Sequence, residues 1–109
     1  MQVFDLSKIK KVYFVGIGGI GISAIVRMFL LNGKEVSGTD ASESPVTEEL
    51  IKSGAKINIG HRAENITEDI DLVVYSIAVS PANPELVRAR ELGLIVMSYP
   101  EILAEVTKN

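Results

Sequence analysis

The sequence contains no cysteine, no tryptophan and only one histidine among its 109 residues. The absence of cysteine excludes disulfides, thiolate metal sites and cysteine nucleophiles. A single histidine, with no carboxylate pair at clear ligand spacing, also argues against a metal site. The composition therefore argues against metal sites and excludes cysteine chemistry, and it is compatible with a reducing, cytoplasmic location.

Excess positive charge and long apolar runs are also lacking. The chain carries 11 Lys and Arg against 14 Asp and Glu, a net charge of −3, which argues against nucleic-acid and anionic-membrane partners. The most apolar run, residues 20–31, is interrupted by Arg27 and is shorter than the ~20 residues of a membrane span. No signal-peptide pattern is present at the N-terminus. With 47% hydrophobic residues, the sequence predicts one folded domain over residues 1–109.

Five short β-type runs alternate with helical runs along the chain. The predicted strands are residues 11–15, 35–39, 56–59, 71–76 and 94–97, and the predicted helices are residues 19–31, 44–53, 83–92 and a last helix from Ser98. Residues 60–70 form a loop in place of one crossover helix. This order predicts an α/β, Rossmann-like, doubly wound fold with a mostly parallel five-stranded sheet and helices on both faces. Ligands of such folds bind at the carboxyl ends of the strands.

The first strand is followed by a glycine-rich loop. Residues 16–21 read Gly-Ile-Gly-Gly-Ile-Gly and match G-x-G-x-x-G between a strand and a helix. Such a loop lets a phosphate approach backbone N–H groups at a helix N-terminus. We therefore expect a phosphate or diphosphate ligand, although a tight turn with close helix–strand packing explains the same glycines. The candidate residues here are Gly16, Gly18, Gly19, Ile20 and Gly21.

Asp40 directly follows the second predicted strand and His61 lies just after the third, both on the expected ligand side. An acidic residue in the position of Asp40 accepts hydrogen bonds from a ribose diol in dinucleotide-binding domains. No Lys or Arg follows closely that could pair with a 2′-phosphate, which disfavours NADP. The alternative is that Asp40 caps its own loop. His61 is a candidate to donate to a phosphate or stack on a base, although a lone loop histidine is often only solvated.

The segment after the fourth strand is small and polar. Its candidate residues are Ser76, Ala78 and Val79, and the alternative is a plain connection in which Asn83 caps the next helix. The acidic residues Glu64, Glu68, Asp69 and Asp71 are expected to form a solvated loop. No G-x-x-x-x-G-K-[ST] loop and no G-x-S-x-G elbow occurs, so the residues indicate a binding module without catalytic groups or a cofactor of its own.

An ordered set of short motifs gives the chain a resemblance to a known family. The motifs are VGIGGIGIS (15–23), VSGTD (36–40), GA (54–55), GH (60–61), SIAV (76–79), NPE (83–85) and YPE (99–101). In this order they resemble the N-terminal domain of the Mur ligases, over roughly residues 10–105. Family members often have methionine in place of Ile22 and serine in place of Ile77. The glycine loop lacks the cysteine that is usual in muropeptide-recycling members, and it resembles that of the alanine-adding members.

The resemblance implies a fold, a ligand and a context. It implies a fragment of a three-domain, cytoplasmic, ATP-dependent ligase that adds L-alanine to UDP-N-acetylmuramate in peptidoglycan synthesis. This domain would hold the UDP part of that substrate and contact the ATP-binding domain, while ATP and Mg²⁺ would bind elsewhere. Gly18 to Gly21 would face the diphosphate, Asp40 would lie by the uridine, and His61 with residues 76–79 would close the pocket. The residues alone leave open an NAD-binding dehydrogenase or regulatory domain, and a structural domain with a vacant pocket.

Overall fold

The fold is built around a central strand whose side chains are buried on both faces of one sheet. The computed structural model describes residues 4–108. Five strands form the sheet: β1 (Lys11–Val15), β2 (Glu35–Asp40), β3 (Lys56–Ile59), β4 (Leu72–Tyr75) and β5 (Ile95–Ser98). Their order is β3-β2-β1-β4-β5, and all four pairings are parallel. The predicted α/β class and parallel sheet are thus confirmed, and β3 and β5 are the edge strands of the sheet.

Within residues 4–108, four α-helices and two short 3₁₀ helices accompany the strands; η1 precedes β1, α4 follows β5, and the other four connect strands. They are η1 (Leu6–Lys8), α1 (Ile22–Leu31), α2 (Pro45–Lys52), η2 (Ala63–Asn65), α3 (Pro84–Glu91) and α4 (Tyr99–Val106). The helix starts follow from their caps, because the side chains of Ser44, Asn83 and Ser98 accept backbone N–H groups of the first turn. These caps confirm the predicted starts of α2, α3 and α4.

Helix α1 begins three residues later than the sequence predicted. Its N-cap is Gly21, which has a φ of +83°. A left-handed residue cannot continue a right-handed helix, so residues 16–21 remain a loop and the helix begins at Ile22. The prediction of residue 19 was wrong because glycine composition does not reveal which glycine takes the left-handed conformation.

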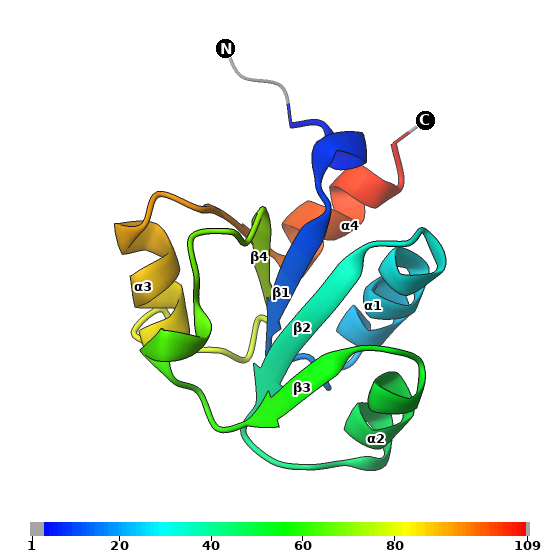
Figure 1. Cartoon of the computed structure of the whole chain (residues 1–109), viewed down its shortest axis with the longest axis horizontal. Coiled ribbons are helices and arrows are strands. Elements are labelled where there is room, and N and C mark those ends of the chain that lie inside the picture. The colour runs from blue at the N-terminus through cyan, green and yellow to red at the C-terminus, as the bar shows by residue number, and fades with distance from the viewer. Residues whose placement is uncertain (1–3, 109) are drawn as a thin grey trace.

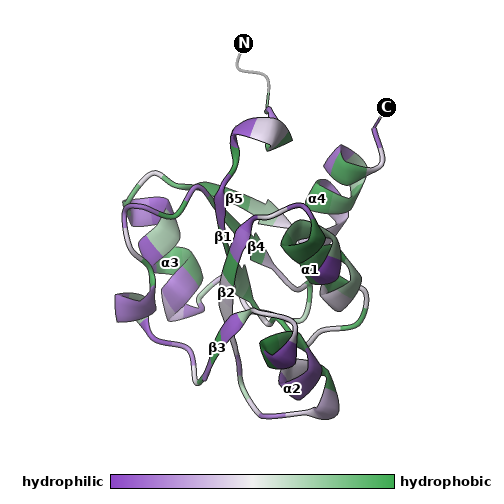
Figure 2. Cartoon of the chain, turned by 45° about the vertical axis from the view of Figure 1, so that its right-hand side comes forward, coloured by the Kyte–Doolittle hydropathy of each residue, from purple (hydrophilic) through white to green (hydrophobic). Residues whose placement is uncertain are grey.

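The two faces of the sheet are covered differently. Helices α1, α2 and α4 pack on one face, where Phe14 lies among Phe29, Leu50 and Ile102 in the larger core cluster. Helix α3 and the segment 60–70 cover the other face around Tyr13. Figure 1 shows α3 on one side of the sheet with α1 and α2 on the other. Figure 2 shows that α3 mixes hydrophilic and hydrophobic colours, whereas much of α1 is hydrophobic.

Candidate functional site

A cavity of about 380 Å³ lies at the carboxyl ends of the central strands. It is formed by the glycine loop after β1, the end of β2, His61 after β3, and the segment that follows β4. The lining residues are Gly16, Gly18, Gly19, Asp40, Ala41, His61, Ser76, Ala78, Val79, Ser80 and Asn83. From β1 the sheet extends to β2 and β3 on one side and to β4 and β5 on the other, so the strand order reverses beside β1. The cavity lies at this switch point.

The structure brings together eight of the ten predicted site residues and places the other two outside this cavity. Ile20 is fully exposed and borders a separate hollow of about 430 Å³ with Ile77 and Tyr99. Gly21 packs against Tyr99, and a Cβ on Gly21 would lie 2.6 Å from the Tyr99 hydroxyl oxygen. The last glycine of the motif therefore has a packing role that the sequence pattern did not reveal.

Within the glycine loop, the N–H groups of residues 16–19 are engaged by the protein itself. Gly16 and Ile17 both donate to the carbonyl of Thr39, at 2.9 Å each, and Gly19 donates to the carbonyl of Gly16 at 3.0 Å. Gly18 donates to Asp40 Oδ2 at 2.9 Å. The loop is thus held in shape before any ligand arrives, and a phosphate that binds the Gly18 N–H must displace the Asp40 carboxylate.

Asp40 makes the contacts that a loop cap makes. Its Oδ2 accepts from Gly18 N and its Oδ1 accepts from Ala41 N at 2.8 Å. A Cβ on Gly18 would lie 3.0 Å from the same Oδ2, so only glycine allows this close approach without displacement. The cap alternative therefore has direct geometric support. The carboxylate also lines the cavity, which keeps ligand contact as a prediction for the same residue.

The segment after β4 turns back on itself at the cavity. Ser76 N donates to the carbonyl of Val15 at 3.0 Å, which ties the segment to β1. Val79 N donates to the Ser76 carbonyl at 3.0 Å, and Ala78 N donates to Ser76 Oγ at 3.3 Å. A Cβ on Gly16 would lie 3.0 Å from both Ser76 Cβ and Val79 Cγ2. The glycine of the first turn therefore lets this segment close one wall of the cavity.

His61 joins the cavity to a buried polar network. Its side chain is 20% exposed, and its Nδ1 lies 2.9 Å from Thr39 Oγ1 and 3.4 Å from Glu85 Oε1. The ring is therefore anchored on its inner side by β2 and α3 while it lines the cavity. Such an anchored histidine differs from the solvated loop histidine that was the alternative expectation.

Glu85 is the centre of this network and is fully buried. Its Oε2 accepts from Tyr13 Oη at 2.8 Å, from Asn65 Nδ2 at 2.9 Å and from Arg62 N at 3.1 Å. Its Oε1 accepts from Thr39 Oγ1 at 2.5 Å. Burial raises the pKa of Tyr13 far above its usual value, so Tyr13 stays a neutral donor to this carboxylate.

Sequence reasoning missed the network, although it had noted Glu85 as part of a helix start. Glutamate in a first helical turn is ordinarily a solvent-exposed, dipole-favoured residue. Nothing local indicates that donors from β1, β2 and the segment 60–70 converge on it. The signal that was available is that Gly60-His61 and Asn83-Pro84-Glu85 both follow strands, whose carboxyl ends meet at one edge of the sheet.

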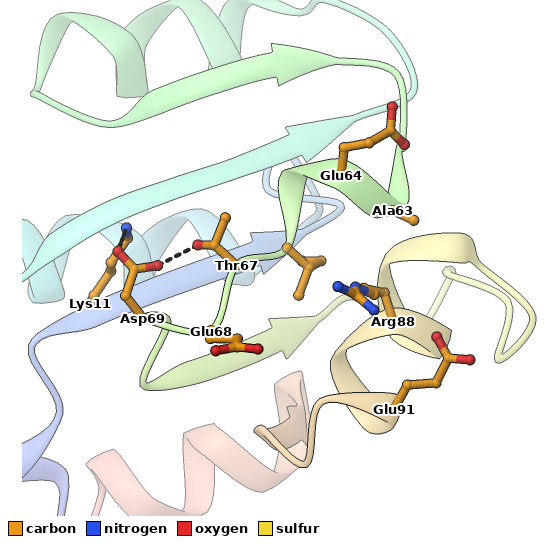
Figure 3. Close-up of a pocket in the computed structure, with 9 residues that line it drawn as sticks. Lys11, Ala63, Glu64, Thr67, Glu68, Asp69, Arg88 and Glu91 are labelled. Atoms are coloured by element: carbon orange, nitrogen blue, oxygen red, sulfur yellow. Dashed lines mark hydrogen bonds and ion pairs between the residues drawn. The ribbon is translucent and has the colours of Figure 1, made fainter.

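A larger groove, of about 950 Å³, lies beside α3 (Figure 3). Its walls carry Lys11, Glu64, Glu68, Asp69, Arg88 and Glu91, with Ala63, Ile66 and Thr67 between them. Lys11 Nζ lies 2.6 Å from Asp69 Oδ2, and Thr67 also donates to Asp69. The hydrogen bond to Lys11 lowers the pKa of Asp69, and the bond to Asp69 raises the pKa of Lys11. Glu64, Glu68 and Asp69 are exposed, as predicted for a solvated acidic loop. Asp71 departs from that prediction, because it is partly buried and accepts from the backbone N–H groups of Lys10 and Lys11.

Two features are absent from residues 4–108. This part of the chain contains no group of three or more His, Asp or Glu side chains that could hold a metal ion. Within the same described residues, no helix has the length and apolar character needed to cross a membrane.

Comparisons with known proteins give the family. The profile described as "Mur ligase family, catalytic domain" matches residues 11–109. The chain is 49% identical over 106 residues to the UDP-N-acetylmuramate–L-alanine ligase of Clostridium kluyveri, covering 97% of this chain and 23% of the relative. It is 46% identical over 101 residues to the ligase of the same name from Sulfurihydrogenibium sp., covering 93% and 22%. The chain thus spans less than a quarter of the length of these relatives.

Solved structures give the same result. The UDP-N-acetylmuramate–alanine ligase MurC of Thermotoga maritima matches with a TM-score of 0.83 and 38% identity, covering 88% of this chain and 22% of that one. A murein peptide ligase of Psychrobacter arcticus matches with a TM-score of 0.80 and 25% identity, covering 88% and 20%. Fold, motif order and sequence identity agree, and the chain belongs to the Mur ligase family.

Proposed function

We propose that this chain binds the UDP portion of UDP-N-acetylmuramate, as the N-terminal part of a cytoplasmic ATP-dependent ligase that adds L-alanine to that nucleotide. The observation that carries the proposal is the cavity at the switch point of the sheet. The glycine loop, Asp40, His61 and the residues 76–79 meet there, although they are far apart in the sequence. A volume of about 380 Å³ falls within the range of small-ligand pockets. The names of the relatives at 46–49% identity support the choice of nucleotide.

Each part of the cavity has a chemical task in this proposal. The glycine loop would hold the diphosphate through backbone N–H groups at the start of α1, where the helix adds partial positive charge. Asp40 would accept hydrogen bonds from the uridine portion, because a carboxylate repels phosphate and suits hydroxyl or N–H donors. Ser76, Ala78 and Val79 would close the wall opposite Asp40. The domain would thus bind substrate and supply no catalytic side chain.

The chemistry of the ligase would then lie in the rest of the protein. The sequence has no G-x-x-x-x-G-K-[ST] loop, so ATP and Mg²⁺ are proposed to bind in parts of the relatives that this chain does not cover. A contact surface toward an ATP-binding domain is proposed at the hollow beside the glycine loop. Ile20 is fully exposed there and Ile77 is 74% exposed, next to Tyr99. Two large apolar side chains in open solvent beside a substrate site suit an interface.

The NAD-binding alternative is not favoured. A shikimate dehydrogenase of Aquifex aeolicus has a similar fold, with a TM-score of 0.56, but only 11% identity, which is a likeness of fold alone. The Gly60-His61 pair and the segment after β4 line the cavity here, whereas an NAD site does not need them.

The proposal is tested by a ligand panel on this chain. UDP, UDP-N-acetylmuramate, NAD and ATP would be titrated separately, with binding read by thermal shift and by NMR. We expect saturable binding of the two uridine nucleotides and none of NAD or ATP. Saturable binding of NAD in place of UDP would overturn the proposal. The chain alone should release no phosphate from ATP when it is mixed with L-alanine and UDP-N-acetylmuramate.

A further inference from the structure

The buried network beneath the cavity fixes the hydrogen atoms around His61. The contact between Thr39 Oγ1 and Glu85 Oε1 is 2.5 Å, so a proton lies between these two oxygens. Thr39 owns a single hydroxyl proton. The direction of this one hydrogen bond therefore decides what Thr39 can offer to the histidine on its other side.

Glu85 is a charged acceptor in this arrangement. Arg62 N and Asn65 Nδ2 can only donate, and both donate to Oε2 together with Tyr13 Oη. A carboxyl group that takes three donors on one oxygen and a short contact on the other is satisfied as the carboxylate. The position of Glu85 in the first turn of α3 favours the same charge state. Thr39 accordingly gives its only proton to Glu85.

The consequence reaches the histidine ring. With its proton committed to Glu85, Thr39 can only accept from His61, so the 2.9 Å contact requires a proton on Nδ1. The 3.4 Å approach of Nδ1 to Glu85 Oε1 favours the same proton position. In the neutral ring the other nitrogen, Nε2, then carries no proton. Residues 4–108 supply no recorded hydrogen bond to Nε2, and His61 lines the cavity.

We infer that Glu85, acting through Thr39, is a positioning residue that holds neutral His61 in the Nδ1–H form and presents Nε2 to the cavity as a hydrogen-bond acceptor. His61 then selects a donor group of the nucleoside, a ribose hydroxyl or the imide N–H of the base, rather than a phosphate oxygen. This inference rests on the proposed function for the identity of the ligand. It replaces the expectation that His61 donates to a phosphate.

The tautomer is measured directly in the ligand-free chain. His61 is the only histidine, so a long-range ¹H–¹⁵N correlation spectrum contains one imidazole and needs no assignment. At about pH 8, where a histidine is ordinarily neutral, we expect a protonated Nδ1 and a bare Nε2. The opposite tautomer would overturn the inference, and this measurement depends neither on UDP binding nor on any variant.

Glu85→Gln tests the chain of hydrogen bonds. The glutamine oxygen must face the three donors around Oε2, which leaves its NH₂ group to donate to Thr39. Thr39 is then free to donate to Nδ1, and His61 should switch to the Nε2–H form. Thr39→Ser is the matched control, because it keeps the hydroxyl and should keep the Nδ1–H form. An unchanged tautomer in folded Glu85→Gln would mean that Glu85 is structural only and would overturn its positioning role.

Affinity measurements with UDP and inorganic pyrophosphate separate this inference from the proposed function. Glu85→Gln should weaken UDP by about two- to tenfold, since Nε2 no longer accepts, and should leave inorganic pyrophosphate unchanged. An equal loss for both ligands would place His61 at the phosphates and overturn the selection of a nucleoside donor. If UDP fails to bind the unaltered chain, the proposed function fails while the tautomer result stands on its own.

Discussion

The groove beside α3 and the cavity at the carboxyl ends of the strands differ in size and in the residues that line them. The groove beside α3 is the larger, at about 950 Å³ against about 380 Å³ for the cavity at the strand ends. The groove is lined by exposed charged side chains, and Lys11 is already paired with Asp69. The cavity is lined mostly by glycines and small residues, with Val79 and the polar side chains of Asp40, His61 and Asn83. Other elements hold Asp40 and His61 in place.

Hydrogen bonds that hold the lining side chains in place, more than volume, distinguish a binding site from a surface groove. An exposed ion pair such as Lys11–Asp69 costs side-chain freedom and returns little free energy, so it fixes the groove wall only weakly. Asp40 and His61 are instead fixed by hydrogen bonds to the glycine loop and to the buried Thr39–Glu85 pair. Fixed polar groups lose little freedom when a ligand binds. Four predictions test this contrast.

The largest expected effect is on stability. Glu85→Leu should lower the free energy of unfolding by about 3–5 kcal/mol, because it leaves the buried hydroxyls of Tyr13 and Thr39 and the Asn65 amide without their acceptor. Lys11→Met in the groove should cost less than about 1 kcal/mol. Urea denaturation of both variants measures the difference. Similar losses at the two sites would erase the contrast between them.

The next effect is on affinity. Asp40→Ala should weaken UDP by roughly ten- to a hundredfold, because it removes a charged hydrogen-bond partner worth about 1.5–3 kcal/mol. Pyrophosphate should bind no more weakly, since a negative charge beside the Gly18 N–H is removed. Calorimetric titration gives both affinities, and Glu68→Ala in the groove is the control that should change neither. Equal proportional losses for UDP and pyrophosphate would reduce Asp40 to a loop cap.

A third effect, on stability, separates a glycine that is both strained and packed from one that is only strained. Gly21→Ala should cost about 2–3 kcal/mol, because the new Cβ meets Tyr99 at 2.6 Å in a backbone with φ of +83°. Gly33→Ala should cost only about 1 kcal/mol, since its φ is +79° but nothing lies within 4 Å of the added atom. Thermal unfolding measures both. A loss at Gly33 as large as that at Gly21 would mean that Tyr99 contributes nothing.

The smallest effect lies at the amino end of β1 and depends on pH. Asp71 accepts from the backbone N–H groups of Lys11 and Lys10, at 2.9 Å each, and these bonds lower its pKa. A lowered pKa stabilises the fold above the ordinary value near 4, and that contribution is lost as the pH falls through the lowered value. Asp71→Ala should therefore cost about 1 kcal/mol at neutral pH, since the side chain is partly exposed. The difference from the unaltered chain should shrink below about pH 4, and a constant difference would contradict the charge dependence.

Much of the fold could be predicted because its signals are local. The run of residues 11–15 is apolar enough to indicate burial on both faces, and Ser44, Asn83 and Ser98 cap helices through contacts within three residues. The cavity followed from a second rule, that the carboxyl ends of parallel strands meet at one edge. That rule brought Asp40, His61 and Ser76 together although 36 residues separate the first from the last.

The roles of Glu85 and Gly21 could not be predicted, because they depend on contacts that no local sequence pattern encodes. The burial of Glu85 requires donors from Tyr13, Thr39 and Asn65, which lie 72, 46 and 20 residues away in the sequence. The packing of Gly21 on Tyr99 likewise joins the start of α1 to the start of α4. Such contacts exist only once the sheet has formed, so the sequence pattern could mark these residues but not their roles.

The central claim is that the smaller cavity, and not the larger groove, binds the uridine nucleotide. The most direct measurement is a titration of the ¹⁵N-labelled chain with UDP, followed by backbone amide shifts. We expect saturable shifts for residues 16–19, for Ala41 and His61, and for residues 76–80, and no shifts for residues 64–69. Shifts confined to residues 64–69, or no saturable shift around the glycine loop at all, would contradict the claim.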